Sequence, residues 1–163
     1  MLRSWMLALA VTAAPVAARA QQVLDLPAPN HTIEFRANHV AGFDIHGQAR
    51  GAPALDYSAG VSVTTLDDGP VLHRLFLDRT HRTFFGYDLR VVPTPEGTRV
   101  RLHFAPLSDI RGFQFDKAGF RQADIPIPPD AMVAPGDPAD IPLLTGLNGA
   151  VTLHETLTVT PAR

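Results

Sequence analysis

The chain contains no cysteine, so neither a disulfide bond nor a lipid-modified N-terminal cysteine can stabilise or anchor it. Its one tryptophan, Trp5, lies in an N-terminal stretch that we expect to be cleaved off, which leaves only Tyr57 and Tyr87 for an aromatic sugar-binding platform. After this stretch no apolar run approaches the roughly 18 residues that a membrane helix needs, so we expect no transmembrane segment. The hydrophobic core alone must then stabilise the fold.

Motifs of the familiar enzymes are also missing. The sequence has no G-x-S-x-G elbow, no H-E-x-x-H zinc motif, no P-loop and no G-x-G-x-x-G turn. It has 7 histidines but no His-x-His pair that would place two imidazoles on one strand face. His39 and His46 are an odd number of positions apart, so on an unbroken strand they would face opposite ways. We therefore expect neither a metal site nor a cofactor.

Residues 1–20 have the features of a cleavable signal peptide. Arg3 gives a positive start, an apolar stretch follows, and Ala18-Arg19-Ala20 is a small-x-small cleavage site before Gln21. Cleavage would remove Arg3 and Arg19 from the 14 basic residues, so that 12 would face 16 acidic residues. This balance argues against nucleic acid or an anionic membrane as the partner, and we predict a periplasmic or secreted protein.

The clearest strand pattern is a predicted hairpin over residues 71–92. Alternation predicts that two sets face inward: Val71, His73, Leu75 and Leu77, and then Phe85, Tyr87, Leu89 and Val91. Because both sets are odd-numbered, the loop must have an odd length, and we favour the five residues 79–83. That register places Arg74 opposite Asp88 and Phe76 over Gly86, whereas a three-residue loop would set Phe76 against Phe84.

Further strands are predicted on both sides of this hairpin. They cover residues 23–26, 32–36, 39–46 with a bulge at Gly42, 61–66, 98–104 after a four-residue loop at 94–97, and 150–160. We expect a surface loop over 47–60, and a Pro-rich segment over 106–149 that is irregular or contains short strands. This pattern predicts one antiparallel β-sandwich domain over 21–163, immunoglobulin-like or similar, with a β-barrel as the alternative.

The hairpin segment carries a resemblance to a known group of proteins. The pattern H-R-x3-D-R at residues 73–79, F-G-Y-D-L at 85–89 and the P-T-P-E-G turn at 93–97 resemble small exported bacterial proteins of unknown function. The resemblance covers about a quarter of the chain and implies export and a β-rich fold. It implies no catalytic residue.

The predicted registers gather a polar patch on the outer face of the sheet. One row contains Arg74, Asp88 and His103, and the neighbouring row contains Leu72, Arg90 and Arg101. Facing arginines repel unless an anion lies between them, so the patch is a candidate site for a small acidic ligand. The alternative is a solvated sheet face whose arginine stems cover apolar neighbours.

Two function classes follow. The leading hypothesis is an exported, non-catalytic binding module for a protein, a polysaccharide or a small ligand, acting through its long loops. The alternative is a hydrolase-type enzyme with its site in residues 106–149. Its acid or base would come from one of four aspartates in that segment: Asp109, Asp116, Asp124 or Asp130.

Two polar residues interrupt apolar strand faces, His73 in the hairpin and Glu155 in the C-terminal strand. A buried, unpaired carboxylate or imidazolium is costly, so each residue needs a partner or an escape to solvent. One hypothesis pairs the two residues with each other in the core. We favour the other, in which a β-bulge near His154 or a position at the sheet rim exposes Glu155.

Overall fold

The computed structural model describes residues 22–25, 32–51, 57–111, 113, 119–145 and 151–163. The expected signal peptide and Asp116 lie outside these residues. Within them no helix is long and apolar enough to cross a membrane.

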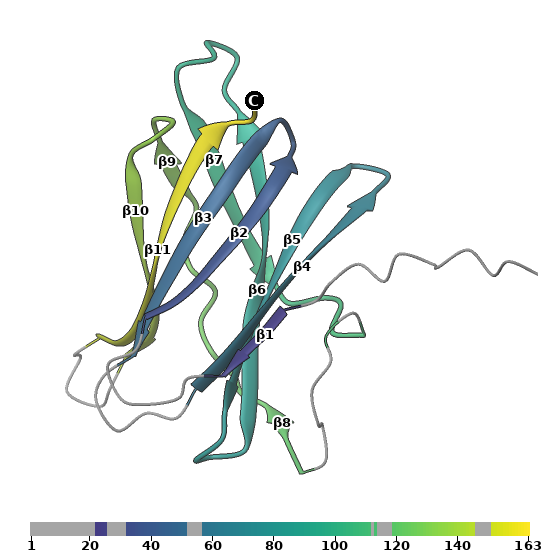
Figure 1. Ribbon diagram of the computed structural model, residues 1–163, viewed down its shortest axis with the longest axis vertical. Coiled ribbons are helices and arrows are strands. Elements are labelled where there is room, and N and C mark those ends of the chain that lie inside the picture. Colours follow the sequence, from purple (N-terminus) through teal and green to yellow (C-terminus); the bar gives the residue numbers. More distant parts are fainter. Residues whose placement is uncertain (1–21, 26–31, 52–56, 112, 114–118, 146–150) are drawn as a thin grey trace, which may run out of the picture.

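Two β-sheets pack face to face, which confirms the predicted all-β sandwich (Figure 1). The larger sheet has the order β1 (Gln22–Asp25), β4 (Tyr57–Leu66), β5 (Gly69–Asp78), β6 (Thr83–Pro93), β7 (Val100–Pro106) and β9 (Ala131–Val133), with β8 (Arg121–Gln122) beside β6. The smaller sheet has the order β10 (Pro138–Thr145), β11 (Val151–Pro161), β3 (Phe43–Gly51) and β2 (Thr32–Val40). Among the described strands, all pairings are antiparallel except the short one between β6 and β8.

Alternating apolar residues from both sheets fill the space between them. From the larger sheet, Leu72, Phe76, Leu89 and Leu102 are buried in this core. From the smaller sheet it receives Ile33, Phe35, Ile45, Ile141, Leu153, Leu157 and Val159. Period-2 alternation in the sequence therefore predicted most of the buried face correctly.

The predicted register of the central hairpin is wrong. Arg74 lies opposite Tyr87 and Phe76 opposite Phe85, and four residues, 79–82, connect β5 to β6. The even-numbered residues of β5 face the other sheet, so the assumption that Val71, His73, Leu75 and Leu77 point inward fails. With that assumption the parity argument for an odd loop also fails.

Strand β5 misleads because both of its faces are buried. The residues Val71, Leu75 and Leu77 are buried outside the main core, as is Phe113 from the segment after β7. On this outer face Leu107 lies over Gly86, where a Cβ would come within 3.1 Å of its Cδ2 atom. A strand covered on both sides carries apolar residues at both phases, so alternation does not reveal which phase faces the second sheet.

Other boundaries also differ from the prediction. Residues 47–51 and 57–60, expected in a loop, extend β3 and β4. Gly42 is not a bulge but belongs with Ala41 to a tight turn, where both residues have positive φ, 53° and 84°. The loop between β6 and β7 has the predicted even length, but with six residues, 94–99, rather than four. The segment 106–149 contains β8, β9 and β10.

Gly47 shows why a glycine stands in a central strand. It pairs with Phe35 across the β2–β3 ladder, and a Cβ at Gly47 would lie 1.9 Å from the phenyl ring. The ring therefore occupies the space above the glycine, and the aromatic cover predicted for Gly86 is found at Gly47.

Candidate functional site

The predicted ligand patch does not assemble. Arg74 points into the core, whereas the other four residues lie on the outer phase of their strands. There each basic side chain has a carboxylate neighbour: Arg90 lies 2.8 Å from Asp68, whereas Arg101 and His103 lie 4.0 Å and 2.9 Å from Asp130. In place of the predicted rows, Arg90 pairs with His103, Val92 with Arg101, and Asp88 with Ala105.

Arg74 belongs to a buried charge cluster with Glu155 and Tyr87. Both charged side chains are fully buried, and Tyr87 is 1% exposed. The Arg74 Nε donates to Glu155 Oε1 at 2.9 Å, and its Nη2 lies 2.8 Å from the same oxygen as an ion-pair contact without an aligned hydrogen bond. The Tyr87 hydroxyl donates to Glu155 Oε2. The cluster therefore joins β5 and β6 of one sheet to β11 of the other.

Further contacts compensate the charge of the Arg74 guanidinium. Its Nη1 donates to the Gly60 carbonyl at 3.2 Å. Its Cζ lies 4.4 Å from the ring centroid of Phe35 and 4.7 Å from that of Phe76. A buried charge needs compensating partners in a core. Arg74 has a carboxylate, a carbonyl and two aromatic faces around it.

Both hypotheses for Glu155 are corrected by this geometry. Its ladder to β3 is unbroken, and although β10 has an irregularity opposite His154, Glu155 stays at the inward phase. Its partners are Arg74 and Tyr87, not His73, which lies on the other face of β5.

Burial gives Tyr87 a distinctive pH response. Burial, and after it the negative charge of Glu155, raise the pKa of Tyr87 well above 10, while Arg74 lowers it in part. An unfolded tyrosine ionises near pH 10, so stability is complete below that pH and falls as the pH rises toward the folded pKa. We expect a loss from this residue of up to about 1.4 kcal/mol per pH unit above pH 10.

This prediction is checked by urea unfolding at several pH values between 9 and 11. Tyr87→Phe should be less stable at pH 9, because Glu155 loses a donor, but should lose less stability than the wild type on going to pH 11. Equal losses in the two proteins would contradict the assignment.

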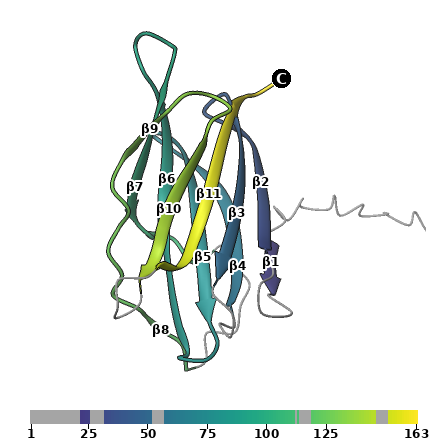
Figure 2. The ribbon, with the colours of Figure 1, turned by 90° about the vertical axis from the view of Figure 1, so that its left-hand side faces the viewer.

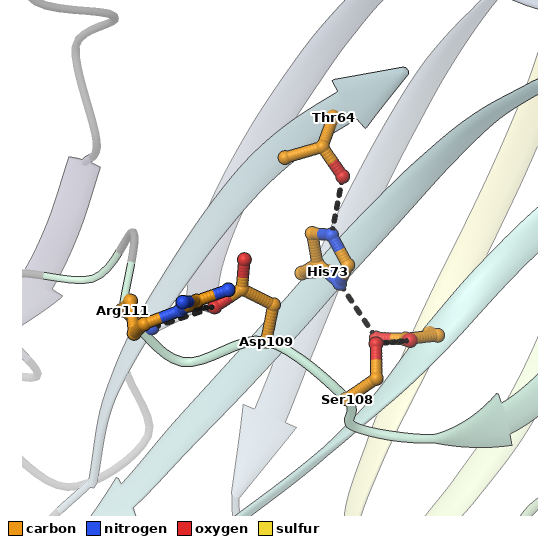
Figure 3. A network of polar contacts seen from close by, with 6 residues as sticks. Thr64, His73, Ser108, Asp109 and Arg111 are labelled. Atoms are coloured by element: carbon orange, nitrogen blue, oxygen red, sulfur yellow. Dashed lines mark hydrogen bonds and ion pairs between the residues drawn. The ribbon is translucent and has the colours of Figure 1, made fainter. Parts of the chain in front are cut away.

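On the outer face of the larger sheet, four side chains form what we call the histidine network (Figure 3). His73 on β5 is 1% exposed; its Nδ1 lies 2.7 Å from Asp88 Oδ1 on β6, and its Nε2 lies 2.7 Å from Thr64 Oγ1 on β4. Ser108, after β7, donates its hydroxyl to Asp88 Oδ2. One chain of hydrogen bonds thus joins the adjacent strands β4, β5 and β6 to the segment after β7.

The aspartates proposed for an enzyme have separate surroundings. Asp109 lies near His73 and accepts from Arg111, whose backbone N–H holds the pKa of Asp109 below its ordinary value (Figure 3). The hydrogen bond from His103 does the same for the pKa of Asp130. Asp124 lines a groove next to β10. In the described part of the chain, no three metal-ligating side chains are placed to hold an ion.

A groove opens at the side of the sandwich where both sheets end. The segment 123–130 runs from β8 to β9 along this side, near β7 and β10 (Figure 2). Between the segment and β10 lies a cavity of about 400 Å³, which we call the proline groove. Its lining residues are Asp124, Ile125, Pro126, Ile127, Pro128, Pro129, Pro142, Leu143, Leu144 and Thr145.

Two smaller hollows lie elsewhere. One of about 200 Å³ is on the other side of the same segment, shares Asp124, Ile125 and Ile127 with the proline groove, and reaches Gly86. The other, about 330 Å³, is a polar depression on the outer face of the smaller sheet. It is lined by Arg36, Asn38, Asp44, Ile45, His46, Thr158 and Thr160.

Sequence reasoning missed the histidine network and the proline groove for different reasons. Thr64, His73 and Asp88 come together only through two strand registers, one of which was predicted wrongly. The groove had a visible signal in the I-P-I-P-P run at 125–129, since such a run forms no regular sheet. Its second wall, on β10, follows from tertiary packing.

Comparison of the chain with protein-family models, with curated proteins and with solved structures finds no significant match in any of the three.

Proposed function

We propose that this protein is an exported binding module that holds an apolar ligand in the proline groove. The observation that carries the proposal is the groove itself, whose volume of about 400 Å³ is within the range of ligand pockets, about 300–1,000 Å³. Eight of its ten lining residues are proline, isoleucine or leucine. Ile127 remains 36% exposed there, so the groove offers apolar surface that the fold does not cover.

The walls favour a small molecule over an extended peptide. Proline has no backbone N–H, and Pro126, Pro128, Pro129 and Pro142 stand on the two sides of the groove. β10 is the edge strand of the smaller sheet, and its Pro138 and Pro142 have no backbone N–H to donate to an added strand. A peptide would therefore find few backbone partners here.

The charge of the groove lining favours one sign of charge on the polar head of the ligand. Asp124 is the charged residue among the lining side chains, and it is exposed at the boundary with the neighbouring hollow. An apolar chain with an ammonium head would place the chain against the isoleucines and the head near this carboxylate. A carboxylate head would be repelled.

Binding is tested with the neutral fluorescent probe N-phenyl-1-naphthylamine, displaced by dodecylamine or by dodecanoate. We expect saturable probe binding, with dodecylamine displacing the probe at lower concentration than dodecanoate. Ile127→Asp should weaken probe binding about tenfold or more, because a charge enters the apolar wall. Asp124→Asn should reduce the preference for the amine.

The matched control is Leu66→Asp, which places the same charge on an apolar residue that is 50% exposed and outside the groove. It should bind the probe like the wild type. Equal weakening by both variants, or no saturable binding by the wild type, would contradict the proposal. Preferential binding of a soluble polysaccharide or a peptide over both amphiphiles would show that the proposed class of ligand is wrong.

A further inference from the structure

The histidine network has the connectivity of an activated nucleophile. One hydroxyl, one imidazole and one carboxylate stand in series, with 2.7 Å between Thr64 Oγ1 and His73 Nε2 and 2.7 Å between His73 Nδ1 and Asp88 Oδ1. A nucleophile within reach of a base, and a base oriented by a third group, is the arrangement that nucleophilic catalysis requires.

The directions of the hydrogen bonds follow from the donors available. Ionised Asp88 only accepts, so it takes one hydrogen bond from the Ser108 hydroxyl and one from His73 Nδ1–H. In the neutral imidazole the other nitrogen, Nε2, then has a free lone pair and accepts the Thr64 proton. The network thus fixes one tautomer of His73 and polarises the Thr64 hydroxyl.

Thr64 is less buried than His73 and Asp88. The residue is half-buried, and the chain becomes exposed immediately after it, from Thr65 through the turn to β5. His73, by contrast, is 1% exposed and Asp88 is 8% exposed, so both are shielded from water. Asp109, close to His73, lies beside them with Arg111 bound to it (Figure 3).

We propose that Thr64 is an acyl-accepting nucleophile that cleaves small esters, with His73 as its base. The Thr64 oxygen forms a bond to the ester carbonyl carbon while its proton passes to His73 Nε2. The carbon–oxygen bond to the alcohol then breaks, and His73 returns the proton to the departing alkoxide. Water, deprotonated by His73, afterwards releases the acyl group as a carboxylic acid and restores Thr64. Asp88 and Ser108 are positioning residues, and the inference is independent of the proline groove.

The experiment treats the full chain with p-nitrophenyl acetate, following release of p-nitrophenol and mapping the acetyl group by peptide mass spectrometry. We expect acetyl on Thr64, retained in Thr64→Ser and absent in Thr64→Val. Asp88→Asn should slow acetylation about 100-fold or more, because the wrong imidazole tautomer then faces Thr64. A merely structural role for Asp88 would alter stability but leave the acetylation rate of the folded protein unchanged.

Thr65→Val is the matched control, since it removes a neighbouring, exposed threonine hydroxyl outside the network. It should react like the wild type, and circular dichroism establishes that each variant is folded. The position of the acetyl group can be mapped on the wild-type protein, so this part of the test does not depend on whether a variant folds. Acetyl found only on Lys117 or the N-terminus, or a folded Thr64→Val that releases p-nitrophenol at the wild-type rate, would overturn the proposal.

Discussion

Glu155→Ala is expected to lower the free energy of unfolding by about 3–5 kcal/mol. The substitution leaves the Arg74 guanidinium as an uncompensated charge between the sheets and the Tyr87 hydroxyl without its acceptor. Both groups are buried, so water does not replace the lost carboxylate. Equilibrium unfolding in urea, followed by circular dichroism, measures the effect.

Glu34→Ala is the matched control for this prediction. Glu34 bonds to Gln48 at 2.8 Å on an exposed face, and its loss should cost less than about 1 kcal/mol. The double variant Arg74→Leu with Glu155→Leu should be more stable than Glu155→Ala, because no lone charge remains in the core. A double variant that is as unstable as the sum of two single variants would contradict the account of an uncompensated charge.

Gly86→Ala is expected to destabilise the protein by about 3 kcal/mol. An added Cβ would lie 2.0 Å from the backbone oxygen of Arg74 and 3.1 Å from Leu107 Cδ2. The first atom belongs to the neighbouring strand, so relief requires that β5 and β6 move apart. That movement would also disturb the buried charge cluster, since Arg74 and Tyr87 are direct neighbours across this ladder.

Gly47→Ala provides the comparison, because there the nearest atoms belong to the Phe35 ring rather than to backbone. A ring can rotate and shift, so the same glycine-to-alanine change should cost less at Gly47 than at Gly86. Thermal or urea unfolding measures the loss of stability in each variant. A larger loss in Gly47→Ala than in Gly86→Ala would contradict this ranking, because it would show that the β5–β6 ladder adjusts to an added methyl group at lower cost than the Phe35 ring does.

The limits of sequence reasoning are clearest at the adjacent residues His73 and Arg74. Alternation predicted the β-sandwich and most of its core positions, because one face of most strands is solvated. It failed at β5, where both faces are buried and both phases are apolar. The prediction then placed His73 in the core and Arg74 on the surface, whereas the arginine is the core residue and the histidine lies under the segment after β7.

A buried arginine between two sheets contradicts the usual preference of its side chain for solvent. Its burial depends on Glu155, which is 81 positions away in the sequence, and on the aromatic rings above it. Sequence reasoning favoured exposure of Glu155 at a bulge or a sheet rim, whereas the packing of one sheet on the other buries this residue with Arg74 and Tyr87 as its partners. The proline groove likewise combines a local sequence signal with a distant strand.

The central claim, that the proline groove holds an apolar ligand, is tested most directly by nuclear magnetic resonance of methyl-labelled isoleucine, leucine and valine during titration with dodecylamine. We predict saturable shifts confined to the groove residues Ile125, Ile127, Leu143 and Leu144. Shifts that are equally large at Leu66 and Val92, two exposed apolar residues outside the groove, would indicate unspecific adsorption and contradict the claim.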